Sequence, residues 1–126
     1  DDGEVVAGVG APVVVDADMA LLRQAVDNLV RNATRRATRV ELAVTGSGRE
    51  AVLEVRDNGP GFDPNVLPRV FDRYARGDRR GEVGMGLAIV KAIVTAHGGT
   101  VSAANLEAGG ACVTVRLPLS RSPFGR

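Results

Sequence analysis

The chain has 126 residues, of which 44% are hydrophobic and 25% charged, the balance of a folded water-soluble domain. Its formal net charge of +1 excludes a general attraction to nucleic acid or membrane, although every basic residue except Lys91 is an arginine. No apolar run reaches the roughly 20 residues that span a bilayer, and the sequence does not begin with a signal segment. We therefore expect one soluble domain over 1–126, with its core at about 4–119 and a tail at 120–126.

The first predicted elements are two short strands joined by a Gly-Ala-Pro turn over 3–15, followed by a helix. Asp16 or Asp18 is the expected N-cap, and the helix runs to about Ala37. Apolar residues at three- and four-residue spacing predict one buried stripe, formed by Leu22, Val26, Leu29 and Ala33. Polar residues share an adjacent face: Gln24, Asn28, Asn32 and Arg35. Solubility alone does not explain this polar row, because a lysine/glutamate ladder would serve it better.

The remaining elements alternate between hairpins and helices. A hairpin is predicted over 39–55 around the turn "TGSGR", a short helix over 66–74, and an irregular loop over "RGDRRGEVGMG". A helix then follows from Gly86 and stops at Gly98, and a second hairpin turns at "EAGG". This order predicts an α+β fold, a two-layer sandwich in which a mixed, mostly antiparallel sheet carries helices on one face.

Two glycine-containing segments are candidate binding sites. In "DNGPG", Asp57 ends a strand and precedes Gly59 and Gly61. This is either a plain turn or a fixed carboxylate that a flat ligand can approach, for example through the exocyclic amine of adenine. In "GEVGMGLAIVKAI" a glycine-containing loop opens a helix, where free backbone N–H groups attract phosphate. The segment matches neither the dinucleotide-binding fingerprint nor the P-loop.

The single cysteine and the single histidine offer no catalytic pair or metal site. Cys112 lies in the alternating segment "ACVTVRL" and is expected to be a buried thiol, and one cysteine excludes an internal disulfide. His97 stands at the end of a helix before two glycines, where it is expected to pack or cap rather than accept a phosphoryl group. The few aromatic residues also argue against a base-stacking surface for single-stranded nucleic acid.

Four segments in order resemble one known family: the asparagine-bearing helix, "DNGPG", "VFDRYARGD", and the loop leading into "GLAIVKAIVTAHGG". Together they are similar to the catalytic ATP-binding domain of bacterial sensor histidine kinases. That domain belongs to the superfamily shared with gyrase, Hsp90 and MutL, whose Bergerat-type fold is an α/β sandwich. The resemblance covers about residues 4–119.

The resemblance implies an ATP and Mg²⁺ site. Asn32 corresponds to the magnesium ligand, Asn28 lies one turn earlier, and Arg35 can reach a phosphate. Asp57 would bind the adenine amine, with Gly59 and Gly61 allowing close approach. The residues that would offer backbone N–H groups or line the phosphate loop are Gly84, Met85, Gly86 and Leu87. The base of the ATP lid would comprise Arg73, Tyr74 and Arg76, with Arg76 contacting the γ-phosphate.

Two residues depart from the family pattern. Arg36 stands where an aromatic residue or histidine usually lies near the adenine, and its guanidinium could stack on the base instead. Glu82 replaces the first glycine of the loop, where a carboxylate would repel phosphate unless it turns to solvent or pairs with Arg79 or Arg80.

Asn28 indicates the type of reaction. ATPases of the superfamily carry a glutamate general base at this position, whereas an amide cannot activate water near neutral pH. With Asn28 and Arg76 as candidate catalytic residues, the expected reaction is transfer of the γ-phosphoryl group of ATP to a histidine on a separate helical hairpin domain. The expected partners are that dimerisation domain of the same parent protein and a cognate response regulator. The parent protein is expected to be anchored in the bacterial inner membrane, with this domain facing the cytoplasm and monomeric when isolated.

Three other functions are compatible with parts of the sequence. A stand-alone serine kinase of the anti-sigma-factor type would explain the missing hairpin, but such kinases usually carry glutamate at the position of Asn28. A nucleotide-sensing module without transfer activity would be consistent with Arg36 and Glu82. Nucleic-acid binding through Arg73, Arg76, Arg79 and Arg80 is the least favoured, because these arginines are better explained as lid residues.

Overall fold

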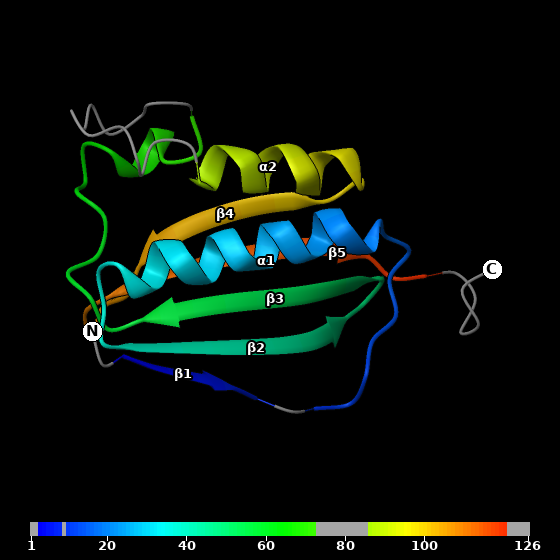
Figure 1. The fold of residues 1–126 in the computed structure, drawn as a ribbon, viewed down its shortest axis with the longest axis horizontal. Helices are drawn as coiled ribbons and strands as arrows, with labels where there is room; N and C mark the ends of the chain where they lie inside the picture. Colours follow the sequence, from blue (N-terminus) through cyan, green and yellow to red (C-terminus); the bar gives the residue numbers. More distant parts are fainter. Residues whose placement is uncertain (1–2, 9, 73–85, 121–126) are drawn as a thin grey trace.

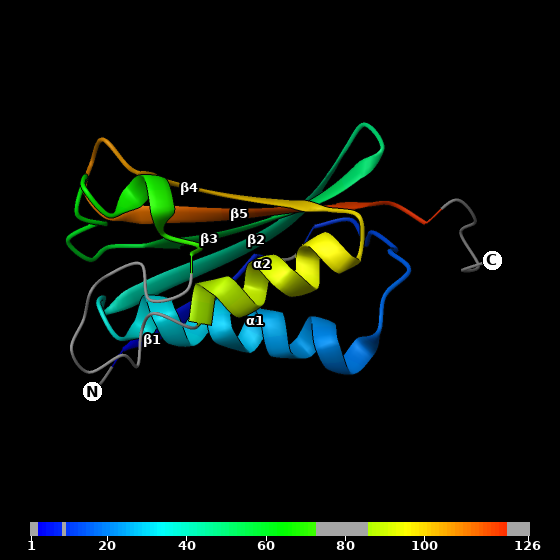
Figure 2. The same cartoon turned by 90° about the horizontal axis from the view of Figure 1, so that it is seen from above.

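The computed structural model describes residues 3–8, 10–72 and 86–120. Its five strands are β1 (Glu4–Ala7), β2 (Arg39–Ser47), β3 (Glu50–Asp57), β4 (Thr100–Asn105) and β5 (Ala111–Pro118). They form one sheet in the order β1-β2-β3-β5-β4, in which β1 runs parallel to β2 and every other neighbouring pair is antiparallel. Helices α1 (Met19–Thr34) and α2 (Gly86–Ala96) lie side by side on one face of this sheet (Figures 1 and 2). The predicted two-layer α+β sandwich is confirmed.

Helix α1 begins at Asp18, which decides between the two predicted N-caps. The Asp18 side chain accepts a hydrogen bond from the Leu21 backbone N–H at 3.1 Å. The helix ends at Thr34, before the predicted Ala37. Beyond that point the backbone N–H groups of Thr38 and Arg39 both donate to the Asn58 side chain at 3.0 Å, which draws the chain out of the helical path and into β2.

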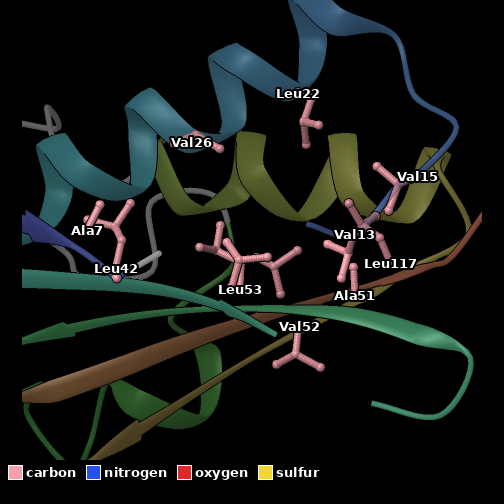
Figure 3. Close-up of a pocket in the computed structure, with 13 residues that line it drawn as sticks. Ala7, Val13, Val15, Leu22, Val26, Leu42, Ala51, Val52, Leu53 and Leu117 are labelled. Atoms are coloured by element: carbon pink, nitrogen blue, oxygen red, sulfur yellow. The ribbon is translucent and has the colours of Figure 1, made fainter. Parts of the chain in front are cut away.

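The buried face of α1 differs from the predicted stripe. Its buried residues are Ala25, Leu29, Asn32 and Ala33. Leu22 and Val26, predicted to be buried, are only partly so, because they border an apolar cavity of about 290 Å³ between α1 and the sheet. Both point toward Ala51 and Leu53 of β3 (Figure 3). The main core lies on the other side of α1, toward α2 and β5, where Val55, Val90, Val113 and Val115 pack together.

The N-terminal segment forms one strand instead of the predicted two. β1 pairs with β2, but of residues 12–15 only Val15 makes an isolated antiparallel bridge, with Leu119. Near the start of α1, the Ser120 backbone N–H donates to the Val14 carbonyl at 2.7 Å, just beyond the end of β5. Gly10 and Val13 come close to Val44 and Gly46 of β2 beyond the last β1 pair, but this part of the chain does not pair as a strand.

The second half of the chain follows the prediction closely. The short helix expected over 66–74 is a single 3-10 turn, Leu67–Arg69, in the part that is described, with proline in its first turn and no side-chain cap. Helix α2 buries Leu87, Val90, Ile93 and Val94 and stops before Gly98, whose φ of +80° is the left-handed conformation expected there. No helix in the described ranges is long and apolar enough to cross a membrane.

Candidate functional site

The centre of the candidate site is the carboxylate of Asp57, at the last residue of β3. Asp57 is only 7% exposed, and Oδ1 accepts hydrogen bonds from the backbone N–H groups of Gly59 at 2.9 Å and Ala111 at 3.3 Å. Oδ2 pairs with Nη2 of Arg36 at 2.9 Å. The carboxylate therefore has a fixed orientation, with one oxygen held by the backbone and the other by a side chain.

The two glycines after Asp57 are required by close contacts within the protein. A Cβ on Gly59 would lie 2.6 Å from the carbonyl oxygen of Arg36. Gly61 has a φ of +84°, and a Cβ there would lie 2.9 Å from Oδ1 of Asn105. The structure therefore gives Gly59 and Gly61 a role in packing the turn against its neighbours, whereas their predicted role toward adenine stays a prediction.

Asn58 joins this turn to the segment that follows α1. Its Oδ1 accepts from the Thr38 and Arg39 backbone, and its Nδ2 donates to the Thr38 hydroxyl at 3.1 Å. The Asn58 backbone N–H also donates to the Arg39 carbonyl at 3.2 Å. The asparagine of "DNGPG" thus holds the end of α1 beside Asp57, which brings the polar end of α1 and the carboxylate into one site.

Phe62 forms one wall of the site and was not predicted as part of it. Its ring is 3% exposed, and the guanidinium of Arg36 lies 4.2 Å from the ring centroid. Asn105 fixes the backbone at Phe62: the Phe62 N–H donates to Asn105 Oδ1 at 2.8 Å, and Asn105 Nδ2 donates to the Phe62 carbonyl at 2.9 Å. Phe62, Asn105 and Ala111 are therefore supporting residues that motif reading missed.

The polar row of α1 divides into exposed and buried members. Gln24 and Arg35 are exposed, Asn28 is half-buried and Asn32 is 7% exposed. The Nδ2 atom of Asn28 is buried and has no hydrogen-bond partner within the described ranges. Burying an amide nitrogen without a partner costs free energy, so Asn28 presents an unused donor beside the buried Asn32.

Several predicted residues cannot be compared with the structure. Tyr74, Arg76, Gly84 and Met85 lie outside the described residues, as do the lid residues Arg73, Arg79, Arg80 and Glu82. Two predicted phosphate-loop residues are described. Gly86 opens α2 with no heavy atom within 4 Å of where its Cβ would stand, and Leu87 buries its side chain in the core.

His97 has the structural role that the sequence predicted. Its Nε2 accepts the Asp18 backbone N–H at 3.1 Å, and its Nδ1 lies 2.8 Å from the Ile93 carbonyl. A carbonyl can only accept, so Nδ1 carries the hydrogen and both ring nitrogens are used. His97 therefore caps the start of α1 from the end of α2. Cys112 is buried, also as predicted.

A strand-end carboxylate lies beside an asparagine-bearing helix within a two-layer sandwich, as expected from the resemblance to ATP-binding α/β-sandwich domains. Residues 17–121 match the family model described as histidine kinase-, DNA gyrase B-, and HSP90-like ATPase. The chain belongs to this family.

The relatives within the family are sensor kinases. The sensor protein KdpD of Escherichia coli is 39% identical over 116 residues, which cover 87% of this chain and 13% of KdpD. The probable sensor histidine kinase TcrY of Mycobacterium tuberculosis is 42% identical over 116 residues, covering 86% of this chain and 24% of TcrY. The chain therefore spans less than a quarter of these curated relatives.

Solved structures of histidine kinases have the same fold as this chain. The ATP-binding domain of PrrB from Mycobacterium tuberculosis matches with a TM-score of 0.79 and 32% identity, covering 94% of this chain and 82% of that one. Full-length ShkA in complex with AMPPNP matches with a TM-score of 0.79 and 29% identity, covering 92% of this chain and 25% of ShkA. The predicted family is confirmed: the chain is an ATP-binding domain of the sensor histidine kinase type. These comparisons give no support to the serine-kinase or nucleotide-sensing alternatives.

Proposed function

We propose that this domain binds Mg-ATP and donates the γ-phosphoryl group to a histidine of a separate helical hairpin domain in a larger two-component sensor kinase. The observation that carries the proposal is the buried, oriented carboxylate of Asp57 at the end of β3. A carboxylate accepts hydrogen bonds only, so it selects a ligand with an amine, as the exocyclic N6 of adenine provides. Full-length ShkA, a structural relative, was solved with the ATP analogue AMPPNP.

The described residues suit a magnesium ion held partly by the nucleotide. Asn32 is nearly buried, and Nδ2 of Asn28 has no hydrogen-bond partner among the described residues, so the Asn28 amide can rotate to offer its oxygen without losing a bond from that nitrogen. Within 3–8, 10–72 and 86–120, no three His, Cys, Asp or Glu side chains are grouped to bind a metal. Asn32 would therefore hold the ion together with phosphate oxygens, and the ion would neutralise phosphate charge.

The residues around the phosphates bind and orient rather than activate water. The amide of Asn28 cannot act as a general base, so hydrolysis lacks the group that would deprotonate water. Arg35 and Arg76 would neutralise phosphate charge, and the backbone N–H groups of Gly84, Met85, Gly86 and Leu87 would cradle the phosphates at the start of α2. Together these residues position the γ-phosphoryl group for a better nucleophile, a histidine ring nitrogen.

The acceptor and the downstream partner lie outside this chain. Because the chain spans less than a quarter of KdpD and TcrY, the hairpin domain would be another part of the same parent protein, with a response regulator receiving the phosphoryl group next. The parent would be anchored in the bacterial inner membrane, with this domain on the cytoplasmic side. As an isolated piece we expect it to be a monomer with no affinity for nucleic acid.

The test of this proposal is calorimetric titration with AMPPNP, with and without Mg²⁺. We expect magnesium-dependent binding to the unaltered chain and at least about tenfold weaker binding to Asp57→Asn, which cannot offer two acceptor oxygens. Arg116→Gln is the matched control, because Arg116 pairs with Glu50 in an exposed ion pair outside the site. Equal affinity in Asp57→Asn would refute the adenine assignment, and the absence of any binding would refute the proposed function.

A further inference from the structure

The pairing of Arg36 with Asp57 conflicts with the role proposed for Asp57. If the carboxylate receives the adenine amine, one of its oxygens must accept a hydrogen bond from the base. Oδ1 already accepts two backbone N–H groups, from Gly59 and Ala111. Oδ2 is the oxygen that remains for a ligand, and Arg36 Nη2 occupies it at 2.9 Å.

Arg36 is held in this position by contacts with Asp57, with Phe62 and with the turn at Gly59. Its side chain is 12% exposed and that of Asp57 is 3% exposed, so the pair is shielded from water and weakly screened. The guanidinium lies over the Phe62 ring at 4.2 Å. The absence of a side chain at Gly59 lets the turn approach the Arg36 backbone, where a Cβ would lie 2.6 Å from the carbonyl oxygen.

We propose that Arg36 is a displaceable occupant of the adenine subsite and thereby sets the affinity and base selectivity of this domain. The inference rests on the proposed function. The adenine amine and the guanidinium are both donors, and because the Asp57 side chain is only 3% exposed with Arg36 against Oδ2, the amine reaches this oxygen only after the guanidinium has moved away. The nucleotide therefore binds only the fraction of molecules in which Arg36 has left that oxygen, and the apparent affinity falls in proportion to that fraction.

The competition depends on the base. Adenine offers a donor at position 6, which requires an acceptor and hence the removal of Arg36. Guanine offers a carbonyl oxygen at that position, which can accept from Arg36 while the ion pair stays in place. Arg36 therefore narrows the preference for adenine over guanine nucleotides relative to a site that has a histidine here.

The experiment compares Arg36→His with the unaltered chain, using calorimetric titration of Mg-AMPPNP and Mg-GMPPNP. A competent fraction of about one tenth predicts that Arg36→His binds AMPPNP about tenfold more tightly, with no gain for GMPPNP, which loses the Arg36 donor to its carbonyl oxygen. Arg36→Lys keeps a cation that can reach Oδ2 and should stay within about threefold of the unaltered chain. Arg116→Gln, remote from the site, should change neither affinity.

A second substitution covers the case in which Arg36→His does not fold. Arg36→Met keeps an apolar contact with Phe62 and leaves Oδ2 open, so it should show the same gain for AMPPNP, with folding checked by circular dichroism. Equal or weaker AMPPNP binding in whichever of the two folds overturns the inference and leaves the proposed function standing. An equal gain for both nucleotides also overturns it, because the effect would not pass through Oδ2. If no variant binds either nucleotide, the proposed function fails and the inference with it.

Discussion

At the scale of single residues, the polar contacts of this domain join segments that are distant in the chain. His97 bonds Asp18, 79 residues away, and Asn105 bonds Phe62 across 43 residues. Ala111 reaches Asp57 across 54 residues. Each contact satisfies a backbone N–H group with a side chain from a distant segment, so the loss of one of these side chains should lower stability.

We expect His97→Leu to lower the free energy of unfolding by about 1 kcal/mol, because leucine fills similar space but leaves the Asp18 N–H without its acceptor. Urea denaturation measures this change. Lys91→Gln, an exposed substitution on the same helix, should change stability by less than about 0.5 kcal/mol. If the two substitutions have equal effects, the bond from Asp18 to His97 does not stabilise the domain.

Asn105→Asp tests how the wall of the site is held. Aspartate retains an acceptor for the Phe62 N–H but places a carboxylate oxygen against the Phe62 carbonyl, now 2.9 Å from a donor. We expect a loss of about 2 kcal/mol in urea denaturation. Ser102→Ala, exposed on the same strand, is the control, and no difference between the two would show that the Asn105 amide does not hold Phe62.

At the scale of elements, the packing is very tight around one glycine, Gly99, and loose around an apolar cavity between α1 and the sheet. Gly99, just after α2, has no room for a side chain, because a Cβ would overlap the Arg116 carbonyl oxygen on β5. The glycine therefore allows the backbone at residue 99 to approach β5 closely. Around Leu22 and Val26 the opposite holds, because the apolar cavity of about 290 Å³ leaves α1 and β3 incompletely packed (Figure 3). A larger side chain should therefore destabilise the domain at Gly99 and stabilise it beside the cavity.

Gly99→Ala should destabilise the domain by about 2 kcal/mol or more, because the new methyl group overlaps the Arg116 carbonyl oxygen and pushes the start of β4 away from β5. Thermal unfolding followed by circular dichroism measures it. Gly10→Ala is the matched control, since its Cβ would meet only the Val44 carbonyl oxygen at an ordinary 3.8 Å. A similar melting temperature for the two variants would contradict the close approach of Gly99 to β5.

Val26→Leu should stabilise the domain by about 0.8 kcal/mol, the value of one buried methylene, because it extends into the cavity without displacing a neighbour. Val5→Leu adds the same group at a side chain that is half exposed and should have little effect. Urea denaturation compares the two. A loss of stability in Val26→Leu would mean that the cavity closes in solution.

At the scale of the whole molecule, the sequence predicts what depends on local period and turn chemistry. The α+β order, both hairpins and the Gly98 stop follow from patterns within a few residues, and the same patterns narrow the N-cap of α1 to Asp16 or Asp18. The exact end of α1 and the absence of a strand over 12–15 do not follow, because both depend on contacts with residues distant in the chain, Asn58 and Leu119. In the site, the sequence predicts Asp57 and Arg36 near the adenine, whereas only the fold shows that Arg36 pairs with Asp57 and that Phe62 and Asn105 lie beside them.

The same arrangement links nucleotide binding to global stability. A ligand that binds only the folded state at about 100 times its Kd stabilises it by about 2.7 kcal/mol, which corresponds to a rise in melting temperature on the order of 8 °C for a domain of this size. We expect Mg-AMPPNP to produce this rise in the unaltered chain. At the same nucleotide concentration the rise should be about half as large or smaller in Asp57→Asn, because a tenfold weaker complex stabilises the folded state by only about 1.4 kcal/mol.

Arg36→Met should reveal that stability and binding are opposed at this site. Without nucleotide its melting temperature should fall by a few degrees, because Asp57 loses a buried partner at Oδ2. With a fixed concentration of Mg-AMPPNP its melting temperature should rise by more than that of the unaltered chain, since no ion pair must open before the base binds. If the nucleotide-free protein melts lower and its rise is also smaller, then Arg36 supports the bound state, and the ion pair would be part of the adenine site rather than its competitor.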